Sequence, residues 1–162
     1  MTELHTRHRE EWEASQVAAE IIERNVWTIE DPLEVDQILN RNTDKKWKHS
    51  THLVPGWAVA GVYPLTGERI MNGVQFKPDE PPKNPKTGKA LKYYSPSKQA
   101  ISPLFLEMPQ YSYWQDVKEN VHQAIAICEG AKTAGALLSA EIPAISIPGV
   151  ATGAKRGRKR TE

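Results

Sequence analysis

Apolar residues recur at helical spacing near the start of the chain, and they predict a helix over residues 9–24. The positions that form its buried stripe are Trp12, Val17, Ala18, Ile21 and Ile22. A second helix is predicted to begin at Asp31, because Asp31 can cap it, Pro32 suits its first position and Glu34 completes a capping box. The chain therefore opens with helices that need a partner surface to cover their apolar sides.

After Pro55 the pattern changes to one that is typical of β-strands. Apolar stretches at residues 57–63 and 71–76 flank a turn-forming segment, which predicts a hairpin. Residues 78–90 contain four prolines, so neither a helix nor a central strand is expected there. An extended loop is predicted instead, followed by a short strand over residues 91–94.

The last third of the chain has the pattern of an α/β unit. A short helix over residues 113–123 precedes a fully buried strand at 124–128, and a helix at 131–140 precedes a second buried strand at 142–147. Strand, helix and strand at this length predict a parallel βαβ crossover. The predicted fold class is therefore α/β, with N-terminal helices, a small mixed sheet and then a partial parallel βαβ unit.

The charge is distributed unevenly between the body of the chain and its last residues. The whole chain carries +1, whereas residues 151–162 hold five bases and one acid, hence +4, which leaves −3 for the rest. The bases of this tail are Lys155, Arg156, Arg158, Lys159 and Arg160. A basic tail on a mildly acidic body predicts contact with nucleic acid.

Four regions are expected along the chain. They are an N-terminal helical region with a basic loop (1–54), a mixed β region with a proline-rich loop (55–110), the βαβ unit (111–153) and a basic disordered tail (154–162). The single cysteine, Cys128, excludes an internal disulfide and is typical of a reducing cytoplasm. The polar N-terminus predicts no signal peptide, and the lack of a run of about 18 apolar residues predicts no membrane span.

A charged residue stands where the predicted βαβ unit does not need one for folding. Glu129 follows the apolar strand directly, Gly130 permits a tight turn, and Lys132 lies in the first turn of the next helix. Ligands of open parallel sheets gather at the carboxyl ends of strands, and a helix N-terminus favours phosphate. Glu129 is therefore a candidate functional residue, and Gly130 and Lys132 are candidates for binding phosphate. The alternative is that Glu129 complements the helix dipole and Lys132 is a solvated surface residue.

Two other chemistries have little support in the residues. The segment 130–133 lacks the first glycine and the Gly-Lys pair of a P-loop. The pairs His5 with His8 and His49 with His52 have His-x-x-His spacing, but each lies in a polar segment without a convincing third zinc ligand. Neither a nucleotide-binding P-loop nor a zinc site is therefore expected.

Residues 124–152 resemble the opening of a TOPRIM domain, which occurs in bacterial-type primases and topoisomerases. The shared features are an apolar strand, the pair Glu129-Gly130, a helix, and a second strand that ends near Gly149. Upstream segments resemble primase cores in the same order, namely residues 73–79, 92–96 and 104–105. The chain is still more similar to an uncharacterised TOPRIM-like family of plasmid and phage replication proteins, notably cyanobacterial ones.

The resemblance implies roles for several residues. In the family the glutamate of the Glu-Gly pair acts as a general acid or base in phosphoryl chemistry, so Glu129 is implied to be catalytic. Lys77 and Lys92 are implied to line a groove that holds phosphates of a template or nucleotide, and Tyr93 to stack on a base. The alternative is that both lysines are strand-edge charges that discourage aggregation.

The family also holds Mg²⁺ with an Asp-x-Asp on a later strand, whereas this chain has no aspartate after Asp116. No complete metal site is therefore expected in this chain, and Mg²⁺ binding is expected only in a full-length relative. The resemblance implies a fragment of a primase-like DNA replication protein, inactive alone, with DNA or RNA and a chain supplying the missing C-terminal half as partners. The alternatives are a non-catalytic nucleic-acid-binding module that uses the basic loop at 41–48 and the tail, or a remnant that folds poorly alone.

Overall fold

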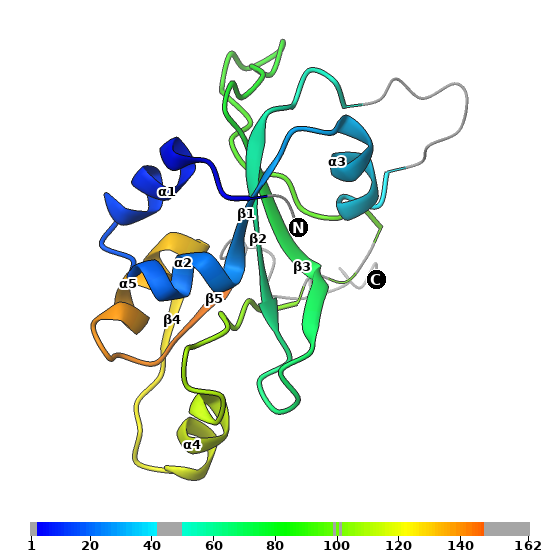
Figure 1. Ribbon diagram of the computed structural model, residues 1–162. Helices are drawn as coiled ribbons and strands as arrows, with labels where there is room; N and C mark the ends of the chain where they lie inside the picture. The colour runs from blue at the N-terminus through cyan, green and yellow to red at the C-terminus, as the bar shows by residue number, and fades with distance from the viewer. Residues whose placement is uncertain (1–2, 42–49, 99, 101, 148–162) are drawn as a thin grey trace, which may run out of the picture.

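The computed structural model describes residues 3–41, 50–98, 100 and 102–147, and its centre is a three-stranded antiparallel sheet (Figure 1). The strands, in spatial order, are β1 (Val26–Ile29), β2 (Gly56–Val62) and β3 (Arg69–Pro78). A parallel pair of strands and five helices surround it: β4 (Ala126–Glu129), β5 (Ala144–Ile147), α1 (Thr6–Glu13), α2 (Ala19–Asn25), α3 (Pro32–Ile38), α4 (Tyr113–Glu119) and α5 (Ala131–Ser139). The predicted α/β class is confirmed. None of the described helices is long and apolar enough to cross a membrane.

Both faces of the three-stranded sheet are apolar, because consecutive residues of a strand point to opposite sides. Trp57 and Val59 of β2 join a core formed with α1, α2 and α5, whereas Ala58 and Ala60 join a second core formed with α3. Figure 1 shows these helices on the two sides of the sheet. Every residue of β2 is buried, so an unbroken apolar run, rather than an alternating one, marks this central strand.

The N-terminal region is helical as predicted, but its limits differ. The single helix predicted over residues 9–24 is wrong, because the chain leaves helical geometry after α1 and begins α2 only at Ala19. Gln16, within the break, has a φ of 64°, a left-handed conformation that ends helices. The break lets Val17 fill the space beside Gly135 of α5, where an added Cβ would lie 2.9 Å from Val17 Cγ1.

Strand β1 follows α2 without a loop and is absent from the predicted elements. All four of its residues are buried, so no alternation distinguishes it from the helix before it. The predicted start of α3 is confirmed, since the Asp31 carboxylate accepts a hydrogen bond of 2.8 Å from the backbone N–H of Leu33. Glu34 accepts a hydrogen bond of 3.0 Å from Nε1 of Trp27, and this contact ties α3 to β1.

The predicted hairpin is confirmed as β2 and β3, with a shift of register near Gly61. The chain approaches itself closely at this point, because an added Cβ on Gly61 would lie 2.3 Å from the carbonyl oxygen of Phe105. The strand predicted over residues 91–94 is reduced to an isolated bridge between Tyr94 and Phe76. The proline-rich loop contributes no strand or helix among the described residues, as predicted.

The predicted strand–helix–strand unit is confirmed as β4, α5 and β5, and its two strands are parallel. The prediction of full burial is wrong, above all for β4, where Ile127 is 70% exposed. Leu104 pairs with Ser146 on one edge of β5, whereas the outer edge of β4 is unpaired within the described residues. The α4 helix begins at Tyr113 as predicted but ends at Glu119, earlier than expected.

Candidate functional site

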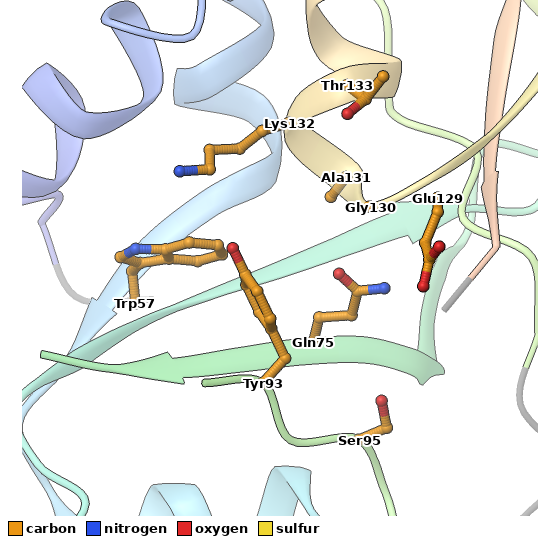
Figure 2. A pocket seen from close by; sticks show the side chains of 9 residues that line it. All are labelled: Trp57, Gln75, Tyr93, Ser95, Glu129, Gly130, Ala131, Lys132 and Thr133. Atoms are coloured by element: carbon orange, nitrogen blue, oxygen red, sulfur yellow. The ribbon is translucent and has the colours of Figure 1, made fainter. Parts of the chain in front are cut away.

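A pocket of about 490 Å³ lies between the β2–β3 hairpin and the N-terminal end of α5 (Figure 2). Its walls come from three separate parts of the chain: the hairpin, the segment 93–95, and the turn from β4 into α5. The residues that line it are Trp57, Gln75, Tyr93, Ser95, Glu129, Gly130, Ala131, Lys132 and Thr133. Its volume lies within the range of about 300–1,000 Å³ that is usual for small-ligand sites.

Glu129 is the last residue of β4, and its carboxylate points into the pocket (Figure 2). Gly130 follows with a φ of 89°, a left-handed conformation that favours glycine, and it caps α5. The carboxylate forms no hydrogen bond or ion pair with the described part of the chain. It is therefore available to a ligand.

Gln75 of β3 contributes a second free polar group. The residue is only 6% exposed, yet its side-chain amide makes no hydrogen bond with any described residue. In Figure 2 the amide and the Glu129 carboxylate point into the same space. Most buried side-chain amides have a protein or water partner, so an unpartnered amide beside a pocket marks a place where a ligand can bond.

Two aromatic rings form one wall of the pocket. The ring centroids of Trp57 and Tyr93 are 6.1 Å apart, with an angle of 64° between the rings. Trp57 is 1% exposed, whereas Tyr93 is 48% exposed. Tyr93 is therefore the ring that remains open to stack on a planar ligand, and Trp57 supports it from behind.

A cluster of charges holds this wall in place, and we call Glu11, Trp57, Lys77 and Lys132 the Glu11 cluster. Glu11 Oε1 accepts a hydrogen bond of 2.8 Å from Lys132 Nζ, and Glu11 Oε2 accepts bonds of 2.8 Å from Lys77 Nζ and 2.9 Å from Trp57 Nε1. Both ammonium groups also lie near the Trp57 ring, at 5.7 and 5.9 Å from its centroid. One carboxylate of α1 thus joins β2, β3 and α5.

These contacts determine the ionisation of Glu11. Burial by itself raises the pKa of this carboxyl, but the hydrogen bonds from Lys132, Lys77 and Trp57 and the charge of Lys132 outweigh burial and lower the pKa to about 2. Glu11 is therefore ionised at neutral pH, and its negative charge offsets part of the positive charge of the two lysines.

The structure brings four of the residues predicted from the sequence to this pocket, namely Glu129, Gly130, Lys132 and Tyr93. Lys77 lies beside the pocket, but it is 19% exposed and bound by Glu11, so it is neither an open groove residue nor a free edge charge.

The other predicted contacts lie elsewhere. Lys92 is exposed and does not line the pocket. The tail bases at 155–160 and most of the basic loop, residues 42–49, lie outside the described residues.

Several residues of the site were not anticipated from the sequence, among them Glu11, Trp57 and Gln75. Gln75 lies between the apolar residues Val74 and Phe76 of a strand, and a polar residue at a buried position is a signal that the sequence can provide. Glu11 gives no such signal, because its role depends on a contact with Lys132, 121 positions along the chain.

The pair His5 and His8 serves the fold. His8 is 2% exposed, with Nδ1 at 2.7 Å from Thr28 Oγ1 and Nε2 at 2.8 Å from Asp79 Oδ1. Burial lowers the pKa of His8, although the hydrogen bond to Asp79 opposes that effect. Among the described residues no group of three or more His, Cys, Asp or Glu could hold a metal ion, and His49 lies outside them.

The fold and the site define a mixed α/β chain with a small-ligand pocket at the carboxyl end of a parallel strand. Residues 113–162 match the family model described as "Domain of unknown function (DUF3854)". An uncharacterised protein of the cyanobacterium Picosynechococcus sp. is 32% identical over 177 residues, which cover 90% of this chain and 18% of that protein. The chain thus spans about a fifth of the length of this relative. No solved structure matches the chain.

Proposed function

We propose that this chain binds single-stranded nucleic acid, DNA or RNA, by taking one base into the pocket. The observation that carries the proposal is the convergence of the exposed Tyr93 ring, the free Glu129 carboxylate and the free Gln75 amide around one cavity of about 490 Å³. Proteins that bind single strands stack bases on aromatic rings and bond the exposed base edges with polar side chains.

Positive charges around the pocket support a contact with the phosphate backbone of the nucleic acid outside the pocket. Lys92 directly precedes Tyr93 and is exposed, so its ammonium group is available to the phosphates on either side of a bound base. Lys132 lies at the pocket but shares its charge with Glu11 at 2.8 Å. The proposal therefore places the nucleobase in the pocket and the phosphates beside exposed basic side chains at the margin of the pocket.

We further propose that this binding serves a DNA replication protein of a plasmid or phage. The support for this step is the resemblance of residues 124–152 to the opening of a TOPRIM domain, together with the primase-like order of the upstream segments. The position of the Glu-Gly pair, between the end of β4 and the start of α5, is a further support for the proposal.

The catalytic role that the resemblance implies for Glu129 stays a separate prediction. Mg²⁺ chemistry requires several oxygen ligands, and Glu129 is the only carboxylate among the described residues that line the pocket. The nearby Glu11 carboxylate is occupied by two lysines and Trp57. The described residues therefore do not fit a Mg²⁺ site.

The experiment is fluorescence anisotropy of labelled single-stranded DNA and RNA with the whole chain, at low and moderate salt. Tyr93→Ala should weaken binding at least about fivefold, because stacking on an aromatic ring contributes about 1–3 kcal/mol per base. Tyr111→Ala is the matched control, since Tyr111 is 94% exposed and lies outside this pocket.

A second arm separates the pocket from the basic tail. A chain without residues 154–162 should keep its sensitivity to Tyr93→Ala, even where its overall affinity falls with the lost charge. Binding that disappears with the tail and does not respond to Tyr93→Ala would show that the tail alone binds nucleic acid, and the pocket proposal would be wrong.

A further inference from the structure

The free polar groups of the pocket restrict the base edge that fits it. The Glu129 carboxylate has two oxygens and only accepts hydrogen bonds, whereas the Gln75 amide both donates and accepts. Both groups face the same cavity (Figure 2). An edge that satisfies them must offer neighbouring donors to the carboxylate and, next to those, an acceptor or a donor to the amide.

We infer that the pocket selects guanine over the other bases. Guanine presents N1–H and N2–H as two adjacent donors for the Glu129 carboxylate, and its O6 accepts from the Gln75 amide while Tyr93 stacks on the ring. Adenine and cytosine place an unprotonated ring nitrogen beside their amino group, and this lone pair would face a carboxylate oxygen. Uracil and thymine offer one N–H between two carbonyls. This inference rests on the proposed function.

Burial makes this discrimination strong. Gln75 is 6% exposed and its amide lines the pocket, so a ligand that covers the amide without bonding to it leaves a polar group unpaired. Sites built to hydrogen-bond a ligand reject analogues that lack the matching group much more strongly than apolar pockets reject a missing methylene. The preference should therefore be visible with single nucleotides.

The charges of the pocket favour a base rather than a phosphate in its interior. The Glu129 carboxylate points inward and would repel a phosphate group. Lys132, the cation that lines the pocket, has its Nζ at 2.8 Å from Glu11 Oε1, so much of its charge is already offset. A neutral ring with donor groups fits this arrangement, with its phosphate outside.

Isothermal titration calorimetry of the whole chain with GMP, IMP, AMP, CMP and UMP tests the inference. GMP should bind at least about tenfold more tightly than IMP, which lacks the N2 amino group, because a hydrogen bond to a charged group contributes about 1.5–3 kcal/mol. AMP, CMP and UMP should bind more weakly than GMP by a similar factor.

Two variants assign the preference to its residues. Glu129→Gln should bind GMP and IMP about equally, whereas the control Glu80→Gln, at an exposed carboxylate outside the pocket, should keep the preference for GMP. Gln75→Leu should weaken GMP and IMP alike, because both carry O6, while its circular dichroism and melting temperature are retained, because the amide bonds to no described residue.

The outcomes separate this inference from the proposed function. Equal affinities for all five nucleotides, or a preference for AMP, would overturn guanine selection and leave single-strand binding in place. A GMP preference that Glu129→Gln does not change would also overturn it. Absence of both nucleotide and oligonucleotide binding would overturn the proposed function as well.

Discussion

Glu11 shows how one side chain can join distant parts of this chain. Its carboxylate is bound by Lys132, Lys77 and Trp57, and its side chain is 29% exposed. Because the folded pKa of about 2 lies below the ordinary value of 4.5, the ionised carboxylate stabilises the folded state. This stabilisation is complete above pH 4.5 and is lost as the pH falls through 2.

Glu11→Gln should lower the free energy of unfolding at pH 7 by about 2–3 kcal/mol, because it leaves two partly buried ammonium groups without their counter-ion. The difference from the unchanged chain should narrow below pH 4.5, and urea unfolding across this range measures it. Glu10→Gln, on the exposed side of the same helix, is the control. A difference that stays constant from pH 7 to 3 would show that the Glu11 charge does not stabilise the fold.

Residues of the site were predictable where the reason is local. Glu129, Gly130 and Lys132 follow one another at the end of a strand, so their sequence order already predicts a shared turn. The stacking role of Tyr93 was predicted only from the resemblance to primase cores. The role of Glu11 was not predictable. Glu11 is one of several acidic residues near the start of a polar helix, and the sequence does not indicate which of them contacts a lysine 121 positions later.

At the scale of elements, the β2–β3 hairpin depends on a close approach. Gly61 lies where the register shifts, and an added Cβ would come within 2.3 Å of the Phe105 carbonyl oxygen. That oxygen also accepts a hydrogen bond of 2.8 Å from the backbone N–H of Val62. The segment around residue 105 therefore needs glycine beside it in order to pair with the hairpin.

Gly61→Ala should lower the free energy of unfolding by about 3 kcal/mol, since backbone atoms must move to admit the methyl group. Gly73→Ala in the same hairpin is the matched control, because its nearest atom would be 3.2 Å away and a smaller loss is expected. Thermal or urea unfolding of both variants measures the two losses of unfolding free energy. Equal losses would mean that the contact with Phe105 is not what requires glycine at position 61.

Elements with a clear period and a clear end were predicted, and elements without them were not. The α3 start has a cap and a proline, and α5 lies between two apolar strands, so both were found. Strand β1 is buried at all four residues and continues from α2 without a turn residue, so its pattern merged with the helix. The exposure of β4 depends on what covers its outer face, and strand periodicity carries no information on that.

At the scale of the whole molecule, several large apolar side chains on β4 and just before it are exposed among the described residues. Ile127 on β4 is 70% exposed, Ile125 is 43% exposed and Val121 is 85% exposed. The outer edge of β4 is unpaired within the described residues. Open strand edges with apolar side chains favour association with other chains.

Ile127→Lys should leave the free energy of unfolding within about 0.5 kcal/mol of the original value and reduce concentration-dependent self-association, measured by sedimentation velocity. Ile145→Lys is the control, because Ile145 is paired with Ile127 in the sheet but is packed against the core and should be destabilising. A large loss of stability in the first variant would show that Ile127 is packed within the molecule.

The Glu11 cluster also has a consequence for the order of folding. A contact between positions 11 and 132 can close only after nearly all of the intervening chain has been synthesised, and contacts of such separation form late. Until then the part of the pocket that the turn into α5 forms is missing, and the hairpin with Trp57 and Lys77 is present without it. We expect the pocket to form only with the last elements during refolding, so that a nascent chain on the ribosome has no complete pocket before α5 has been synthesised.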